Sequence, residues 1–213
     1  MPIVFSEDIN KNQKIAVWKI TESESELRTI LKTGKRGIEE LFLIKDDANR
    51  MRSIAARVLA QQICKEMNIS YQGILKSEIG NPYLCDCDKN IAISHSDQFA
   101  AVHFSLIKSA GIDIQNIVPK IRNIQNRVFS KKEIALFGKT DQELTLLWAS
   151  KECAFKTLQI PGVDFIDELE VTVFDSSYLQ VFYQPTKSAI KMKYLLIEDC
   201  ILVYDLHNDV AIY

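Results

Sequence analysis

Two segments of this sequence carry apolar residues at the spacing of an amphipathic helix, and strand-like runs surround both segments. In residues 49–67 the apolar positions are 51, 54, 55, 58, 59, 63 and 67. In residues 141–158 the apolar side chains include Leu144, Leu147, Trp148, Phe155 and Leu158. Side chains three or four residues apart share one face of a helix. The sequence therefore predicts one long helix in each half of the chain.

Short runs rich in β-branched and aromatic residues predict strands on both sides of these helices. They cover residues 15–20, 91–94, 99–107, 111–114, 169–174, 179–183, 192–197 and 201–205, and a further helix is expected at 21–33. The order is a strand, helices and a strand pair, followed by a strand, helices and several strands. This order predicts an α+β fold with two similar halves, residues 1–108 and 109–213. The similarity of the halves rests on element order only, because no sequence repeat is visible.

Composition limits the classes of function. The 213 residues include 26 Lys and Arg and 28 Asp and Glu, which gives a net charge of −2. The chain therefore has no bulk basic charge for binding nucleic acid. No stretch of about 18 apolar residues predicts a membrane helix, and Glu7 and Asp8 break the apolar N-terminus too early for a signal peptide. We expect a cytoplasmic protein with no nucleic-acid or membrane partner and with its five cysteines as reduced thiols.

A pair of acidic residues in contrasting settings is the first candidate for chemistry. Asp113 is flanked by isoleucines in the strand-like run G-I-D-I, and Glu152 lies in the middle of the second long helix. Trp148, Glu152 and Lys156 follow one another four residues apart, so they share one stripe of that helix. Taken alone, such a stripe is more often a surface ion pair, and an acid such as Asp113 is more often a strand-edge residue than a metal ligand.

Ser94, His95 and Ser96 end a predicted strand and form the second candidate. A serine hydrolase needs its nucleophile beside a base and a third, orienting group, and no G-x-S-x-G nucleophile elbow occurs in the sequence. A single histidine at a strand end is more often structural. The functional alternative is a phosphate contact, because an imidazole N–H beside backbone donors suits an anion.

Five short motifs occur together in this chain, and together they favour the functional interpretations of Asp113, Glu152 and His95 over the structural ones. In order, the chain has G-N-P at 80–82, I-S-H-S at 93–96, G-I-D-I at 111–114, F-S-K-K-E at 129–133 and W-A-S-K-E-C-A-F-K at 148–156. The set resembles the Sfp-type 4′-phosphopantetheinyl transferases. Their motifs are G-x-P, S-H-S, G-I-D-I-E, F-x-x-x-E and W-x-x-K-E-[AS]-x-x-K. Residues 45–59 also resemble the Arg-bearing helix in the first half of that family.

The resemblance implies two similar α+β halves with the active site at their interface. It also implies the reaction: phosphopantetheine moves from coenzyme A to a serine of an apo acyl or peptidyl carrier protein, with Mg²⁺ as cofactor and 3′,5′-ADP as product. Asp113 and Glu152 match the metal-binding acids of the family, and Gln115 is a third candidate ligand. Glu152 is also the candidate acceptor of the serine proton, and Lys156 is expected to hold or protonate the departing phosphate. Such chemistry depends mostly on positioning and charge neutralisation.

For coenzyme A, the resemblance points to residues of the first half. His95 is expected to donate to a phosphate beside Ser94, and Asn81 is a candidate hydrogen-bonding residue in the G-N-P turn. A cation near the 3′-phosphate is also expected, and the candidates are Lys35, Arg36, Arg50 and Arg57. Two departures matter, because the family usually has Glu at the position of Gln115 and Lys at the position of Asn81. They predict weaker affinity for magnesium and for coenzyme A.

The segment 116–132 contains five basic residues and no acidic residue. A solvated surface and a docking patch for an acidic carrier protein both fit this composition.

Two rival functions also stay open. One is a catalytically idle coenzyme A-binding or carrier-binding paralogue on the same fold, and the other is an unrelated magnesium phosphohydrolase, for which the sequence has no P-loop. A chain with two similar halves can build a cleft alone, so a monomer is expected.

Overall fold

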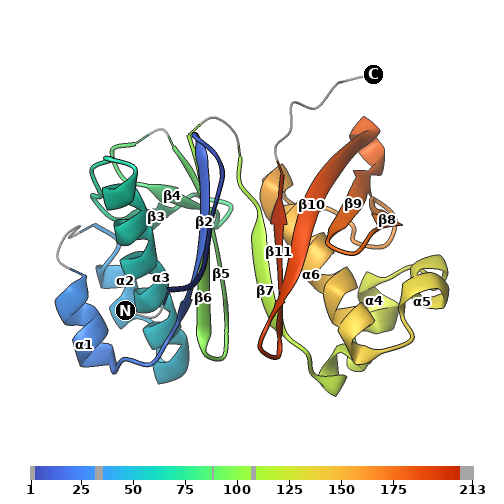
Figure 1. Ribbon diagram of the computed structural model, residues 1–213, viewed down its shortest axis with the longest axis horizontal. Helices are drawn as coiled ribbons and strands as arrows, with labels where there is room; N and C mark the ends of the chain where they lie inside the picture. Colours follow the sequence, from blue (N-terminus) through green and yellow to red (C-terminus); the bar gives the residue numbers. More distant parts are fainter. Residues whose placement is uncertain (1–2, 32–35, 88, 107–108, 207–213) are drawn as a thin grey trace. The chain divides into compact units, whose positions relative to one another are not determined.

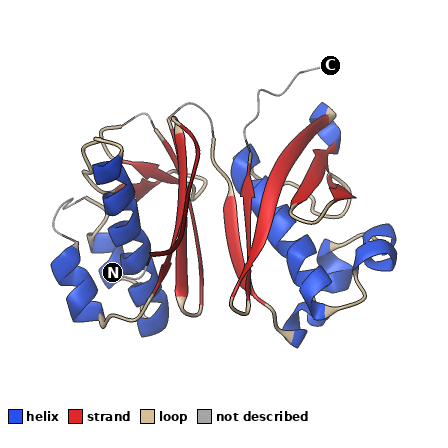
Figure 2. Cartoon of the chain, viewed as in Figure 1, coloured by secondary structure: helices blue, strands red, loops and turns tan. Residues whose placement is uncertain are grey.

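The computed structural model describes residues 3–31, 36–87, 89–106 and 109–206 (Figure 1). The chain divides into two compact units, Met1–Ala110 and Gly111–Tyr213. Each unit contains one antiparallel sheet with helices packed on it (Figure 2). The predicted combination of helices with antiparallel strands is confirmed, whereas the similarity of the two halves stays a prediction. None of the helices in the described ranges is long and apolar enough to cross a membrane.

The first unit holds a six-stranded sheet in the order β1-β2-β6-β5-β4-β3. Its elements are β1 (Ile3–Asn10), β2 (Gln13–Lys19), α1 (Glu24–Ile30), α2 (Glu39–Phe42), α3 (Asp47–Glu66), β3 (Ile74–Lys76), β4 (Pro82–Leu84), β5 (Asn90–Ser96) and β6 (Phe99–Ser105). Helix α3 begins where the Asp46 side chain accepts a hydrogen bond from the backbone N–H of Asn49, at 2.6 Å. It ends before Asn68, whose φ of 57° is the left-handed conformation typical of the residue after a helix.

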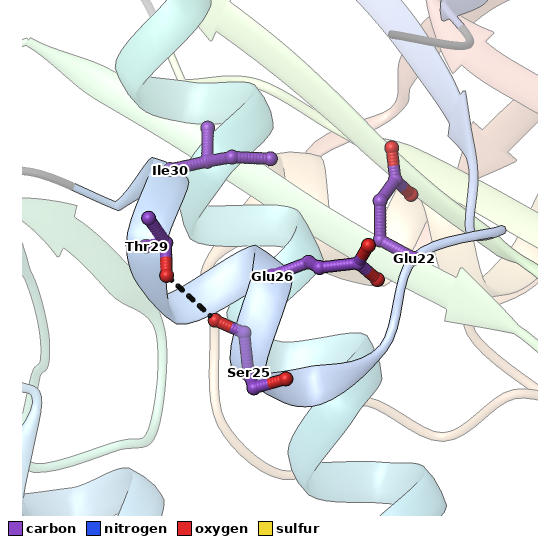
Figure 3. Close-up of a pocket in the computed structure, with 5 residues that line it drawn as sticks. All are labelled: Glu22, Ser25, Glu26, Thr29 and Ile30. Carbon is purple, nitrogen blue, oxygen red and sulfur yellow. Dashed lines mark hydrogen bonds between the residues drawn. The ribbon is translucent and has the colours of Figure 1, made fainter.

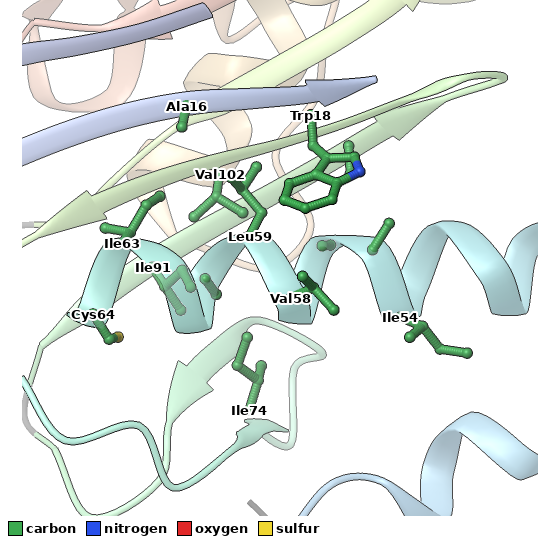
Figure 4. Close-up of a cluster of buried hydrophobic side chains, with 14 of the residues drawn as sticks. Ala16, Trp18, Ile54, Val58, Leu59, Ile63, Cys64, Ile74, Ile91 and Val102 are labelled. Carbon is green, nitrogen blue, oxygen red and sulfur yellow. The ribbon is translucent and has the colours of Figure 1, made fainter. Parts of the chain in front are cut away.

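The core of the first unit lies between α3 and the sheet. Trp18 of β2 and Val102 of β6 belong to the same buried cluster as Ile54 and Leu59 of α3 (Figure 4). All four side chains are fully buried. The apolar face predicted for residues 49–67 therefore packs against the sheet, as expected for an amphipathic helix.

The second unit holds a five-stranded sheet in the order β7-β11-β10-β9-β8. Its elements are β7 (Ile112–Asn116), the 3₁₀ helix η1 (Pro119–Asn123), α4 (Gln125–Val128), α5 (Lys131–Phe137), α6 (Asp141–Leu158), β8 (Leu169–Phe174), β9 (Tyr178–Tyr183), the 3₁₀ helix η2 (Gln184–Thr186), β10 (Ser188–Ile197) and β11 (Cys200–Asp205). Helix α6 begins with a capping box in which Thr140 and Glu143 satisfy each other's backbone N–H groups. It packs against β7 and β11.

Gly111 explains how closely β7 approaches α6. A Cβ atom at this position would lie 2.0 Å from Oγ1 of Thr157 and 2.4 Å from the carbonyl oxygen of Cys153. Only a residue without a side chain fits such a contact. The glycine therefore allows β7 to lie directly against the last turns of the helix.

The structure differs from the sequence expectations in the first unit. The helix expected at 21–33 covers only Glu24–Ile30, because Ser23 caps its start together with Glu26, and residues 32–35 lie outside the described part. Strand β1 is not among the predicted strands, since its residues alternate between half-buried and exposed and include acidic side chains. Strands β3 and β4 are also missed, and each is only three residues long.

Candidate active site

Strand β7 and helix α6 bring Asp113 and Lys156 together. Asp113 lies opposite Val203 of β11 in the sheet and is 1% exposed. The Nζ atom of Lys156 donates to Oδ1 of Asp113 at 2.7 Å and to the carbonyl oxygen of Ile112 at 3.0 Å. Lys156 of α6 therefore forms its ion pair with a residue of β7. The stripe of Trp148, Glu152 and Lys156 is not simply a surface ion pair within one helix.

Gln115 contacts the other oxygen of the same carboxylate. Its Nε2 atom donates to Oδ2 of Asp113 at 2.9 Å. The two residues are two positions apart on β7, and alternate residues of a strand point to the same side. Both oxygens of Asp113 therefore accept hydrogen bonds from side chains of this unit.

Glu152 shares the electrostatic environment of this pair. It lies one turn before Lys156 on α6 and is half-buried. The pKa of Glu152 is raised to about 7, mainly by burial and also by the nearby carboxylate of Asp113, while Lys156 opposes the shift. The structure thus brings Asp113, Gln115, Glu152 and Lys156 together, although they come from distant parts of the unit.

This group has the chemistry of a hard-cation site. Mg²⁺ prefers oxygen ligands and keeps several water molecules, so one or two carboxylates together with substrate phosphates are enough. The pKa of Glu152 is raised first by burial and then by the carboxylate of Asp113, and a divalent cation held between the two acids would oppose this shift. Within the described ranges, no set of three or more His, Cys, Asp or Glu side chains could hold a metal. The two carboxylates, Asp113 and Glu152, therefore fit magnesium that is held jointly with a substrate.

Lys151, which the sequence reasoning leaves without a role, is fully buried beside Glu133. Its Nζ atom donates to Oε2 of Glu133 at 2.8 Å and to the carbonyl oxygens of Val128 at 3.2 Å and Phe165 at 2.6 Å. Glu133 also accepts from the backbone N–H of Val171 at 3.0 Å. The pair therefore joins α6 to α5 and to the start of β8.

The sequence contains a pattern that predicts the role of Glu133 but none that predicts the burial of Lys151. Ser130 and Glu133 stand three residues apart in F-S-K-K-E, which is the spacing of a capping box, and they form one at the start of α5. The burial of the lysine has no comparable signal, because a Lys on a helix is usually exposed.

Trp148, on the stripe of Glu152, is half-buried and packs on Phe165, with 5.6 Å between the ring centroids.

The predicted coenzyme A residues of the first unit occupy varied environments. Ser94 is buried in β5, and its neighbour His95 is exposed. Asn81 lies in the turn between β3 and β4, where its backbone N–H donates to Oγ of Ser77 at 3.1 Å. Arg36 is exposed and pairs with Asp86 at 2.8 Å. Lys35 lies outside the described residues.

Arg50 and Arg57 share α3 but differ in their partners. Arg50 pairs with Glu24 at 3.1 Å and with Asp47, and it donates to the carbonyl oxygen of Ile44. Arg57 is 7% exposed and donates to the carbonyl oxygen of Ser53 within its own helix, while its Nε atom has no hydrogen-bond partner among the described residues. Burial lowers the pKa of Arg57. Arg57 is therefore less neutralised than Arg50 by neighbouring acids.

An open pocket beside α1 contains none of the predicted site residues (Figure 3). Its acidic side chains already serve the local structure, since Glu22 accepts from the indole N–H of Trp18 and Glu26 accepts from the backbone N–H of Ser23. We therefore do not consider this pocket an alternative to the site around Asp113.

The basic segment 116–132 is only partly available as a surface. Ile121 and Phe129 are buried in the core of the second unit. Arg122 pairs with Asp141, and Lys132 pairs with Glu170. The remaining basic side chains, Lys120, Arg127 and Lys131, are exposed.

A comparison with known protein families finds a match in the part of the chain that contains the candidate site. Residues 109–204 match the family model of the 4′-phosphopantetheinyl transferase superfamily. The matched range contains Asp113, Gln115, Glu152 and Lys156. No curated protein matches the chain. The second unit is thus similar to a domain that transfers phosphopantetheine, and this match agrees with a transferase function in general.

Proposed function

We propose that this protein transfers 4′-phosphopantetheine from coenzyme A to a serine hydroxyl of an apo acyl or peptidyl carrier protein and releases 3′,5′-ADP. The observation that carries the proposal is the convergence of Asp113, Glu152 and Lys156 within the range that matches the superfamily. The reaction breaks the phosphoanhydride bond of coenzyme A and forms a phosphoester bond to the serine oxygen, with 3′,5′-ADP as the leaving group. It therefore requires neutralised phosphate charge and a base for the incoming hydroxyl.

Asp113 and Glu152 are the residues that would hold Mg²⁺, with Gln115 beside them. When bound, the ion would neutralise charge on the diphosphate of coenzyme A. The two carboxylates make a small set of hard oxygen donors, while Gln115 presents its NH₂ group to Asp113. Such a set leaves coordination positions for phosphate oxygens and water.

Glu152 and Lys156 are proposed to handle the proton and the leaving phosphate. A carboxyl group with a pKa of about 7 exchanges protons readily near neutral pH, so Glu152 is suited to accept the serine proton directly or through water. Lys156 carries an ammonium group that is already aimed at a buried carboxylate. We propose that this group holds the departing phosphate by charge-assisted hydrogen bonds.

The first unit supplies the candidate contacts to the coenzyme A phosphates, which stay predictions. They are Asn81, Ser94, His95, Arg36 and Arg57, with Lys35 outside the described residues and Arg50 already paired with two acids. The exposed basic side chains Lys120, Arg127 and Lys131 are proposed to attract the acidic carrier protein. A monomeric cytoplasmic protein is the accompanying expectation.

Mass spectrometry of several apo carrier proteins tests the proposal. Incubation with coenzyme A, Mg²⁺ and the protein is expected to add one phosphopantetheine to the carrier. Asp113→Ala and Glu152→Ala are expected to abolish the addition. Asp167→Ala is the matched control, because Asp167 is an exposed acid of the same unit, and this variant is expected to keep the activity. Absence of any mass change across the carriers with saturating Mg²⁺ would refute the transferase.

The second candidate function is a non-catalytic coenzyme A-binding protein on the same fold. Gln115 favours it, because this residue brings no charge to the acids and donates to Asp113. Calorimetry that detects coenzyme A binding, together with no carrier modification, would select this function. Loss of binding in Arg57→Met, with retention in Arg50→Met, would then identify the cation involved.

A further inference from the structure

Each oxygen of the Asp113 carboxylate accepts a hydrogen bond from a side chain in this structure. Lys156 donates to Oδ1 at 2.7 Å and Gln115 donates to Oδ2 at 2.9 Å. An ionised carboxylate only accepts hydrogen bonds, so the carboxamide of Gln115 must present its NH₂ group to it. In this arrangement Gln115 is a donor to Asp113, and its oxygen is the end that does not face the acid.

Without a metal, the two acids and Lys156 leave the group with at most one net negative charge. Asp113 and Glu152 contribute the negative charges, Lys156 contributes one positive charge, and Gln115 contributes none. A divalent cation that binds the protein alone must compete with an ammonium group and an amide for the same carboxylate. The affinity of an oxygen-ligand site depends strongly on its number of charged ligands.

We propose that Gln115 is a positioning residue that holds Asp113 on protein donors, so that the protein captures a divalent cation together with a diphosphate ligand and binds the cation weakly without one. The inference rests on the proposed function, because coenzyme A is the diphosphate it invokes. A diphosphate brings the missing negative charge. It also offers Lys156 an alternative partner, since ammonium groups form strong charge-assisted hydrogen bonds with phosphate.

Titration with Mn²⁺, followed by electron paramagnetic resonance of the free ion, tests the inference without measuring activity. Three samples are compared: the protein alone, the protein with coenzyme A, and the protein with 3′,5′-ADP, which has no diphosphate. Coenzyme A without protein provides the correction for Mn²⁺ bound to the nucleotide. Coenzyme A is expected to raise the Mn²⁺ affinity of the protein by about tenfold or more, and 3′,5′-ADP is expected to leave it nearly unchanged.

Substitutions of Gln115 give the second measurement. Gln115→Glu replaces the donor with a third carboxylate and is expected to raise the Mn²⁺ affinity of the protein alone by about tenfold. Gln115→Met removes the donor to Oδ2 of Asp113 without adding charge, so it is expected to raise the Mn²⁺ affinity of the protein alone, by less than Gln115→Glu does. Gln142→Glu is the matched control, since Gln142 is exposed on α6, and it is expected to leave Mn²⁺ binding unchanged.

The outcomes separate this inference from the proposed function. It is overturned if the wild-type protein binds Mn²⁺ equally well with and without coenzyme A, or if Gln115→Glu binds no more tightly than the wild type. Either result leaves the transferase proposal intact when carrier proteins still gain phosphopantetheine. Failure of coenzyme A to bind in calorimetry would refute the proposed function, and this inference with it.

Discussion

Replacement of Lys151 with Met tests how strongly one buried ion pair holds α6 in place. The side chains of Lys151 and Glu133 are 0% and 2% exposed, and Nζ of the lysine donates three hydrogen bonds, to Glu133, Val128 and Phe165. Met is unbranched and flexible, so it fills most of the space of the lysine stem. The substitution therefore removes the charge and its hydrogen bonds with little change in volume.

The expected cost follows from the acid that stays behind. Removal of one partner of a buried ion pair costs about 3–5 kcal/mol, because the other charge is left without compensation. Lys132→Met is the matched control, since Lys132 pairs with Glu170 but is 70% exposed. An exposed pair contributes only about 0–1 kcal/mol. Lys151→Met should therefore destabilise the protein several times more than Lys132→Met.

Urea unfolding followed by circular dichroism measures both free energies. The double variant Lys151→Met, Glu133→Gln is expected to recover only part of the loss. The amide leaves no buried charge, but its single oxygen can accept from only one of the backbone N–H groups of Ser130 and Val171. If Lys151→Met unfolds within about 1 kcal/mol of Lys132→Met, the buried pair does not stabilise the second unit and the reasoning is wrong.

Three further predictions concern single residues. Because the pKa of Glu152 lies near 7 in the folded protein and near 4.5 ordinarily, its contribution to the free energy of unfolding falls as pH rises through this window, by about 2–3 kcal/mol. Urea unfolding at pH 5 and 8 without metal should show a flatter profile in Glu152→Gln, and an unchanged profile would contradict the shift. Gly111→Ala places Cβ against Thr157 and should cost about 3 kcal/mol, so an unchanged melting temperature would contradict the close packing. Iodoacetamide should label half-buried Cys87 before buried Cys64, whose pKa burial raises to about 12. Mass spectrometry gives the order of labelling, and modification of Cys64 first would contradict this reasoning.

Much of the secondary structure is readable from the sequence because the periodicity is strong. The helix predicted at 141–158 coincides with α6, and the strand predicted at 169–174 coincides with β8. Helix α3 extends two residues before the predicted start at 49, where Asp46 provides the cap. Strand β1 was missed, since a sheet edge that is half exposed carries a weaker apolar signal.

The candidate site is only partly readable in this way. The resemblance selects Asp113, Glu152 and Lys156, and the structure brings these three together. Their pairing is not encoded by spacing, because it depends on how β7 packs against α6. The same holds for Gln115, which the sequence suggests as a ligand and the structure shows as a donor to Asp113.

Helix geometry explains why one short motif contains both structural and chemical residues. Successive residues of a helix point about 100° apart, so Lys151 and Glu152 face different surroundings although they are adjacent. Lys151 anchors α6 to α5 and to the chain before β8, while Glu152 lies with Lys156 on the side of β7. We therefore expect the Lys151 contacts to set the rotation of α6 that brings Glu152 near Asp113. Weakening the anchor should change the pKa of Glu152 as well as the stability, and a variant that changes only the stability would show that β7 alone sets the site.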